Sequence, residues 1–471
     1  MKQSIDRLLG ARLLSRQAVL GFGMAAAVVA GVAACGGNNN PFCPNLPMAD
    51  GLIGQSSYSV NPATGTSGTT LAGPTGSVGL YSNSQYMYIA DTGNNRVLAF
   101  SPVPSGAINS ANAQFAIGQA TLQGNSGGTA TVPNNTYGIG LSSPTKASIG
   151  GGGQLVVADR GNNRVLIWNS APTGASGNQV APDVVIGQPN ATASVSNNNT
   201  GFSSSLCPAG TNGKPSQCNV NGPTSAAITS KGQLMVVDKG NSRVMIWNSV
   251  PTVSGTPADL EVGEKDFNTV VSGQVDGYNG TTYILQMNSP TDVWTDGSQM
   301  LVSDTGNNRV LYWYSLPSTN NDISTAFVYG QTKFASQVSG SGQQGLNGPT
   351  GVALSGSNLF IGDTQNNRVL QFLVSQTNGT SAKYVFGQQD FTHTAYNDTD
   401  QNGQPGNQQN NQSNTLPAQN VLYNPQGVAV SNDGQQIYVT DNGNSRVMEF
   451  LISAGVDGTY TNNCNGVNPQ Y

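Results

Sequence analysis

A seven-residue pattern recurs six times along the chain and constrains its fold more than any other feature. Each copy reads Asp, a variable residue, Gly or Gln, Asn, Asn or Ser, Arg and Val. The copies begin at Asp91, Asp159, Asp238, Asp304, Asp363 and Asp441. A β-rich run precedes each copy and another follows it, as in Leu155–Ala158 and Leu166–Trp168. Because a strand, a Gly/Asn turn and a second strand form a hairpin, the pattern predicts six β-hairpins.

Two further signals accompany the hairpins. A proline stands 14 to 17 residues before each Asp, at Pro74, Pro144, Pro223, Pro290, Pro349 and Pro425. An apolar residue followed by Gly-Gln or Gly-Glu also recurs, ending at Gln55, Gln119, Gln188, Glu264, Gln331 and Gln388. Proline is tolerated at the first residue of a strand, so each repeat has a first strand, a hairpin and a Gly-Gln strand. Four-stranded sheets repeated radially form a β-propeller.

The phase of these signals predicts how the ring closes. The first Gly-Gln strand, Leu52–Gln55, precedes the first proline, and no such strand follows the sixth hairpin. We therefore expect the N-terminal strand to complete the last blade, which leaves no open sheet edge. The predicted fold is all-β, a six-bladed β-propeller of four-stranded blades over residues 51–471, closed by its N-terminal strand.

The repeated Asp-x-Gly-Asn-Asn-Arg-Val, with its proline and aromatic strand ends, resembles the NHL repeat over roughly residues 51 to 452. For most propellers of this family the resemblance implies binding of protein, RNA or another ligand. For a few similar propellers it implies lyase or lactonase chemistry. Such a resemblance indicates architecture rather than function.

The N-terminus has the features of a secretory signal. An apolar run, Ala18–Ala34, ends directly before Cys35, and basic residues precede it at Lys2, Arg7, Arg12 and Arg16. The run is shorter than the ~20 residues of a membrane span, and the stretch resembles the lipobox of bacterial lipoproteins. We expect a helical signal peptide at 1–34 and a lipidated tether at 35–50. This places the protein in the cell envelope, attached to the membrane only by the lipid on Cys35. A plain signal peptide and an uncleaved anchor are the alternatives.

The chain has five cysteines, an odd number for an exported protein. If Cys35 carries lipid, four remain. Cys207 and Cys218 lie 11 residues apart in one polar loop, where a local disulfide is plausible. Cys43 and Cys464 lie near opposite ends of the chain. They can pair only if the fold brings those ends together, as the predicted closure would do.

The repeated Asp and Arg have two interpretations. They could form a ring of equivalent polar sites, or they could build the turns, since Asn and Asp favour turn conformations and Arg can bond across them. Occurrence in every blade favours a structural role. The residues concerned are Asp91, Arg96, Asp159, Arg164, Asp238, Arg243, Asp304, Arg309, Asp363, Arg368, Asp441 and Arg446.

Candidate catalytic and metal-binding residues are few. The chain has one histidine, His393, which cannot supply a cluster of His ligands. We assign no acidic residue in the six first strands and no catalytic residue or cofactor. Asp398, Asp400 and Asn402 match the first half of a calcium loop. However, position 12 would be Gln409, so a plain Asn/Gln-rich loop is the preferred interpretation.

Charge and loop length narrow the function. Eighteen Lys and Arg against 23 Asp and Glu give a net charge of −5, too few basic residues for a nucleic-acid surface. The Asp-to-Asp spacings are 59 to 79 residues, above the about 40–45 of WD40-type blades. The excess lies mostly in loops between a Gly-Gln strand and the next proline. These loops should share a face with the Asp–Arg turns.

The leading hypothesis is a lipid-anchored, non-catalytic binding or scaffold protein. Its partner would be an envelope protein or a glycan of unpredicted identity, bound through this loop face. The loops that contain Cys207–Cys218 and Phe391–Asn414 are the candidates for specificity. The alternatives are a metal-dependent hydrolase or lyase that uses the central channel, and a structural surface or adhesin component.

Overall fold

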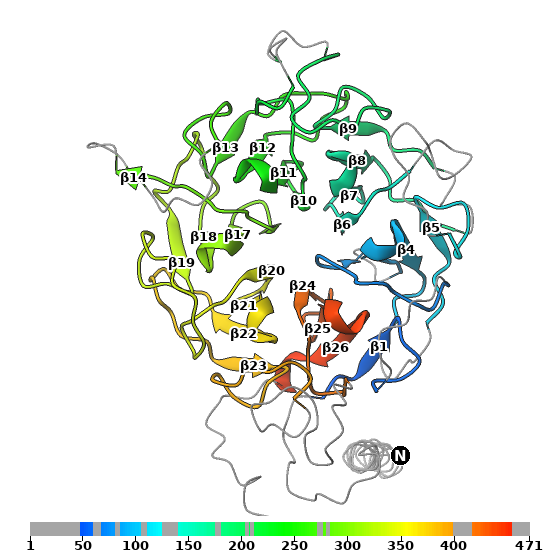
Figure 1. Ribbon diagram of the computed structural model, residues 1–471, viewed down its shortest axis with the longest axis vertical. Helices are drawn as coiled ribbons and strands as arrows, with labels where there is room; N and C mark the ends of the chain where they lie inside the picture. Colours follow the sequence, from blue (N-terminus) through cyan, green and yellow to red (C-terminus); the bar gives the residue numbers. More distant parts are fainter. Residues whose placement is uncertain are drawn as a thin grey trace, which may run out of the picture. The chain divides into compact units, whose positions relative to one another are not determined.

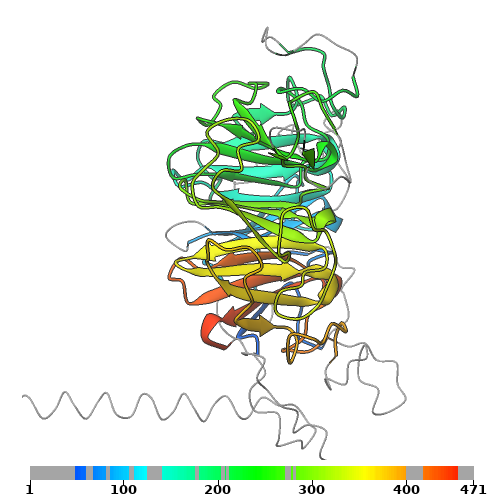
Figure 2. The same cartoon turned by 90° about the vertical axis from the view of Figure 1, so that its left-hand side faces the viewer.

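The fold is a ring of six four-stranded antiparallel sheets, seen along the ring axis in Figure 1 and edge-on in Figure 2. In this computed structural model the described residues are 48–59, 67–80, 85–104, 111–124, 140–174, 180–202, 207, 212–270, 277–278, 283–398 and 417–454. All of them fall within one compact unit, Asn45–Tyr460. The predicted six-bladed β-propeller is confirmed.

In blades 1 to 5 the four strands follow in sequence order from the ring axis outward. Blade 1 consists of β2 (Gly79–Leu80), β3 (Met87–Asp91), β4 (Arg96–Phe100) and β5 (Phe115–Ile117). Blade 2 consists of β6 (Pro144–Ile149), β7 (Leu155–Asp159), β8 (Arg164–Trp168) and β9 (Val184–Ile186). Blade 3 consists of β10 (Ser225–Ile228), β11 (Leu234–Asp238), β12 (Arg243–Trp247) and β13 (Leu260–Val262). Blade 4 consists of β16 (Asp292–Thr295), β17 (Met300–Asp304), β18 (Arg309–Trp313) and β19 (Ala326–Tyr329). Blade 5 consists of β20 (Pro349–Ser355), β21 (Asn358–Asp363), β22 (Arg368–Leu373) and β23 (Tyr384–Phe386). A separate small hairpin, β14 (Gly277–Tyr278) and β15 (Tyr283–Ile284), precedes blade 4.

The sixth blade joins the two ends of the propeller. It consists of β24 (Pro425–Val430), β25 (Gln436–Asp441), β26 (Arg446–Leu451) and the N-terminal strand β1 (Gly51–Ile53). Strand β1 pairs antiparallel with β26, with Leu52 opposite Met448. The predicted closure is therefore confirmed, and it removes the two sheet edges that an open array would expose.

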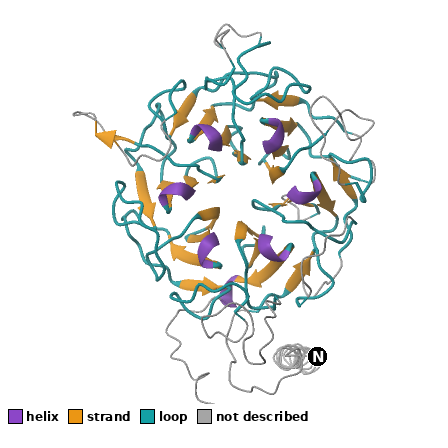
Figure 3. Ribbon diagram, in the orientation of Figure 1, coloured by secondary structure: helices purple, strands orange, loops and turns teal. Residues whose placement is uncertain are grey.

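A short 3₁₀ helix joins the second and third strands of every blade, and these turns form a ring on one face in Figure 3. The six helices are η1 (Thr92–Asn94), η2 (Arg160–Asn162), η4 (Lys239–Asn241), η5 (Thr305–Asn307), η6 (Thr364–Asn366) and η7 (Asn442–Asn444). The next residue is an Asn or Ser in the left-handed region, as at Asn163 with φ 51°. Short polar side chains tolerate that conformation best after glycine. We call this side of the ring, with its Gly-Gln-to-proline loops, the motif face.

The hydrophobic core lies between neighbouring blades. Tyr88 and Val97 of blade 1 pack with Leu155 and Trp168 of blade 2 in one buried cluster. The same arrangement closes the ring, because Ile53 on β1 joins a buried cluster with residues of blade 1. Six similar interfaces hold the inner strands at fixed distances from the axis.

No helix among the described residues has the length and apolar character needed to cross a membrane. The predicted signal peptide, together with Cys35, Cys43 and Cys464, lies outside the described part of the chain.

Candidate functional site

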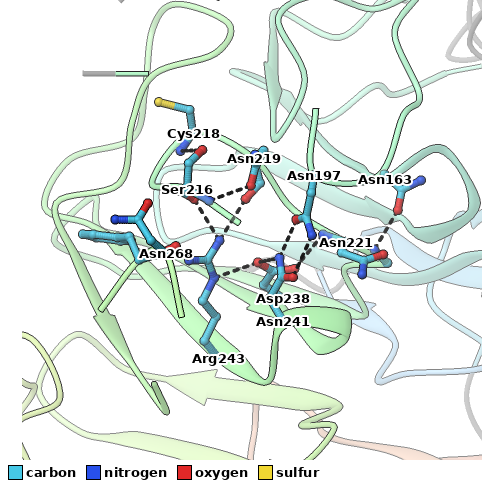
Figure 4. A network of polar contacts seen from close by, with 12 residues as sticks. Asn163, Asn197, Ser216, Cys218, Asn219, Asn221, Asp238, Asn241, Arg243 and Asn268 are labelled. Carbon is cyan, nitrogen blue, oxygen red and sulfur yellow. Dashed lines mark hydrogen bonds and ion pairs between the residues drawn. The ribbon is translucent and has the colours of Figure 1, made fainter. Parts of the chain in front are cut away.

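The motif turn of blade 3 shows how the repeated residues are used (Figure 4). Arg243 Nε and Asn241 Nδ2 donate to Asp238 Oδ2 at 2.8 and 2.7 Å, and the Asn221 amide donates to Oδ1 at 2.7 Å. The remaining Arg243 nitrogens donate to backbone carbonyls, including that of Ser216 at 2.8 Å. One Asp–Arg pair thus joins the hairpin turn to the two loops beside it.

The same ion pair occurs in all six blades, with Arg Nε to Asp Oδ2 distances of 2.6 to 2.8 Å. The side chains of all twelve residues are buried. Burial raises the pKa of the Asp159 carboxyl, while Arg164 and the hydrogen bonds to the carboxyl lower it. Since the guanidinium groups bond the protein's own carbonyls, the ring of Asp and Arg serves the structure of the blades.

The left-handed residue that follows each 3₁₀ helix links its blade to the next. Asn163 Oδ1 accepts from the Gly222 amide of blade 3 at 2.8 Å (Figure 4). At the junction of blades 6 and 1, Ser445 Oγ accepts from the Gly73 amide at 3.2 Å. The fifth motif position therefore requires Asn or Ser for its conformation and for its acceptor.

Several other sequence-predicted site residues belong to loops of the motif face. The predicted disulfide between Cys207 and Cys218 is present, with Cα atoms 5.6 Å apart. Asp398 is buried, whereas Asp400 and Asn402 lie outside the described residues. Within the described residues no group of three or more His, Cys, Asp or Glu side chains could hold a metal ion. His393 contacts Asp390 of its own loop, with Nδ1 2.8 Å from Oδ1.

A different set of residues meets at the ring axis, where the chain runs two residues past each proline. Three blades have glycine there: Gly76, Gly351 and Gly427. A Cβ at Gly427 would lie 1.9 Å from the Gly76 carbonyl oxygen, and one at Gly76 would lie 2.2 Å from that of Thr145. Only glycine permits this close backbone approach.

The other three blades place Lys146, Ser225 and Asp292 at this level. Lys146 Nζ lies 2.6 Å from Asp292 Oδ1, and Ser225 Oγ donates to the same oxygen at 2.7 Å. Asp292 Oδ2 accepts from Ser77 Oγ at 3.2 Å and from the Val352 amide at 3.1 Å. These residues are at most 7% exposed. Five blades contribute to this cluster, which we call the axial cluster (Ser77, Lys146, Ser225, Asp292 and the Val352 amide).

A cavity of about 260 Å³ lies along the axis on the side of the axial cluster away from the motif face. Lys146 lies at its inner end, and its lining reaches Ser431 and Asn432 in the turn after β24. Small side chains leave the space open, among them Ser148, Ala227, Ala353 and Ala429. Apolar and polar groups share the remaining wall. We call the inner end of the cavity, where Lys146 lies, its floor.

Comparisons with known proteins agree with the repeat architecture. The NHL repeat family model matches residues 422–450, which include β25 and the sixth motif. The sixth blade of this propeller contains an NHL repeat. No curated protein sequence matches it.

The solved structures that match this chain are distant from it. An auxiliary nutrient binding protein from Bacteroides ovatus is 10% identical, with 86% of this chain and 76% of that chain covered and a TM-score of 0.47. One from Bacteroides thetaiotaomicron is 10% identical, with 88% and 78% covered and a TM-score of 0.49. Virginiamycin B lyase from Staphylococcus aureus is 9% identical, with 84% and 98% covered and a TM-score of 0.40.

The axial cluster corrects the expectation that no acidic residue in the first strands belongs to a site. We assigned no acidic residue in the first strands, but Asp292 begins β16 and lies at the centre of the cluster. The signal was present in the sequence. Glycine follows the proline by two positions in blades 1, 5 and 6, whereas blades 2, 3 and 4 have Lys146, Ser225 and Asp292. Three neighbouring blades thus replace the glycine of the repeat at the same position, and the structure brings these three residues together at the ring axis.

Proposed function

We propose that this protein binds a small ligand in the axial cavity, which the ligand enters from the face opposite the motif turns. The observation that carries the proposal is the cavity itself, which lies between the six inner strands and has Lys146, the cation of a buried Lys–Asp pair, in its lining. Binding sites for small molecules are typically concave and mostly apolar, with a few polar groups that fix orientation. This cavity is concave, and apolar and polar groups share its lining on six strands.

The contacts of the motif face favour the cavity over the loop face as the binding site. There the Arg side chains bond loop carbonyls, and Asn197 and Asn397 exchange hydrogen bonds with the motif residues Asn241 and Asn444. Much of the polar surface on this side is therefore used within the molecule.

The chemistry of the floor favours binding over catalysis. Asp292, the buried partner of Lys146, accepts hydrogen bonds from five donors in the protein. A carboxylate so occupied is poorly placed to take a proton from a substrate, because a general base must reach that proton directly.

A filled cavity tests the proposal. In Ala429→Leu the longer side chain should occupy space within the cavity wall, while Ala191→Leu adds the same group to an exposed loop of the motif face. We would screen a small-molecule library against the full chain in mild detergent by thermal shift. Wild type and Ala191→Leu should share stabilising compounds that do not stabilise Ala429→Leu. Compounds that stabilise all three proteins equally would overturn the cavity as the site.

We further propose that Cys35 carries lipid and holds the propeller at a membrane of the cell envelope, as the small residues before it suggest. Cells expressing the wild-type chain should incorporate an alkyne fatty acid into it and retain it in the membrane fraction. Cys35→Ser should lose the label. A labelled Cys35→Ser variant would contradict lipidation at this residue.

A further inference from the structure

At the floor of the axial cavity, one N–H donor of Lys146 is available to a ligand. A lysine ammonium has three N–H donors. Lys146 Nζ uses one on Asp292 Oδ1 at 2.6 Å and another on the Val293 carbonyl at 3.0 Å. No third acceptor for it occurs among the described residues, and Lys146 lines the cavity. A ligand oxygen at the inner end of the cavity could accept from this group.

Asp292 offers a ligand little in return. Its Oδ1 accepts from Lys146, Ser225 Oγ and the Val293 amide, and its Oδ2 accepts from Ser77 Oγ and the Val352 amide. A carboxylate has about four lone-pair sites, and five donors fill them. The floor therefore calls for a hydrogen-bond acceptor on the ligand rather than a donor.

The charge balance of the floor selects against ionised ligands. The single positive charge of Lys146 is already compensated by Asp292, and both side chains are at least nine-tenths buried. A bound carboxylate would leave one uncompensated negative charge at this depth, and a bound ammonium one uncompensated positive charge. Burying an unpaired charge is costly, so an uncharged acceptor suits the floor best.

Above the floor the lining combines apolar and polar groups. Val78, Ile228, Val293, Leu354 and Val430 line the cavity together with Trp294, a partly exposed aromatic side chain. Apolar atoms of a ligand gain by leaving water for such a wall. Polar groups that line the outer part include Ser355 and Asn432.

We propose that the cavity takes an uncharged molecule with a carbonyl or amide oxygen at one end and a partly apolar body, bound with that oxygen against Lys146. This inference rests on the proposed function, since it specifies the ligand class of the same cavity. It excludes fatty acids and amines as preferred ligands.

The test compares three probes that differ only in the head group: 3-phenylpropanamide, 3-phenylpropanoate and protonated 3-phenylpropylamine. Binding to the full chain would be measured by ligand-observed NMR at pH 7. We expect the amide to bind about 10-fold more tightly than the amine, the ratio typical of one hydrogen bond to a charged group. The carboxylate should also bind more weakly than the amide.

A double variant isolates the role of the floor. Lys146→Met combined with Asp292→Asn removes both charges together and preserves side-chain length, so no buried charge is left alone. It should reduce the affinity for the amide about 10-fold while retaining the native circular dichroism spectrum. The Ala429→Leu variant should weaken binding of every probe.

The outcomes separate the two proposals. Tightest binding of the carboxylate or the amine, abolished by Ala429→Leu, would overturn the ligand class and leave the cavity as the site. An unchanged amide affinity in the double variant would also overturn the ligand class. Equal binding of all probes by wild type and Ala429→Leu would contradict the cavity itself. If the amide does not bind but library compounds of another class bind in a way that Ala429→Leu abolishes, the proposed ligand class is wrong and the cavity remains the site.

Discussion

Lys146 Nζ lies 2.6 Å from Asp292 Oδ1, although the two residues belong to blades 2 and 4 and are separated by 146 positions in sequence. Ser225 of the intervening blade donates to the same carboxylate oxygen at 2.7 Å. Lys146, Ser225 and Asp292 therefore connect three successive blades at the ring axis. They also set the polarity of the cavity floor.

Removing one partner of this pair should destabilise the propeller more than removing both. Lys146→Met leaves Asp292 buried without its cation, and breaking a buried pair in this way typically costs about 3–5 kcal/mol. The double variant Lys146→Met/Asp292→Asn leaves no charge uncompensated, so its free energy of unfolding should lie closer to that of wild type. Urea unfolding of the three proteins measures the difference. A double variant as unstable as the single one would show that charge compensation is not what the pair contributes.

The sequence predicted the propeller because its signals are local and repeated. The turn residues Asp91–Val97, the six prolines and the Gly-Gln strands each act within one blade, and their phase predicted closure by Leu52–Gln55. The axial cluster could not be derived in the same way, because its members meet only when the ring is built. Lys146 and Asp292 are ordinary residues within their own strands and become a pair only through blade geometry.

The predicted binding face also differs from the one that the cavity favours. Loop length drew attention to the motif face, where Cys207–Cys218 and His393 lie. Loop length, however, says nothing of the space between six inner strands. That space depends on small residues such as Ala227 and Ala429, which sequence patterns do not distinguish from ordinary core residues.

Glu261 should make stability depend on pH. It lies on β13 with no exposed surface, and both carboxyl oxygens are without a hydrogen-bond partner among the described residues. Burial raises its pKa from 4.5 to about 8, against the opposing effect of Arg243. Between these values the folded state keeps a proton that the unfolded state releases. The free energy of unfolding therefore falls as the pH rises through this range.

Replacing this carboxyl should remove that loss. Glu261→Val places valine where the equivalent strands of blades 2 and 4 have Val185 and Val328. Its advantage over wild type should grow between pH 5 and 8, by at most about 1.4 kcal/mol per pH unit. Chemical unfolding at several pH values measures this. Asp433→Asn is the control, because hydrogen bonds lower the pKa of this exposed carboxyl and its effect should be constant above pH 5. A constant difference for Glu261→Val would contradict the prediction.

Asn163 separates the two requirements of the fifth motif position. It has φ 51°, and its Oδ1 accepts from the Gly222 amide. Asn163→Ser should cost least, since blades 3 and 6 use Ser242 and Ser445, although it loses the bond from Asn163 Nδ2 to the Ser194 carbonyl at 2.9 Å. Asn163→Gly keeps the conformation but loses the bond, whereas Asn163→Ala loses both and should cost about 1–2 kcal/mol more than Gly. Thermal unfolding of the four proteins should follow this order. An alanine variant as stable as the serine variant would show that neither requirement operates.

The Cys207–Cys218 disulfide offers a test of stability and of the binding face at once. The bridge closes a loop with a sequence separation of 11 residues, so its loss should lower the free energy of unfolding by about 2–3 kcal/mol. Urea unfolding with and without reductant measures this. A Cys207→Ala/Cys218→Ala variant serves as the control, because any effect of reductant that remains in it comes from the other cysteines, Cys43 and Cys464 among them.

The same double variant bears on where the ligand binds. The bridge lies on the motif face, where the carbonyl of Ser216 accepts from Arg243, and the cavity opens on the opposite side. If the ligand enters the axial cavity, the affinity of 3-phenylpropanamide should match that of wild type under conditions where both proteins are folded. A large loss of affinity would instead favour binding through the loops of the motif face.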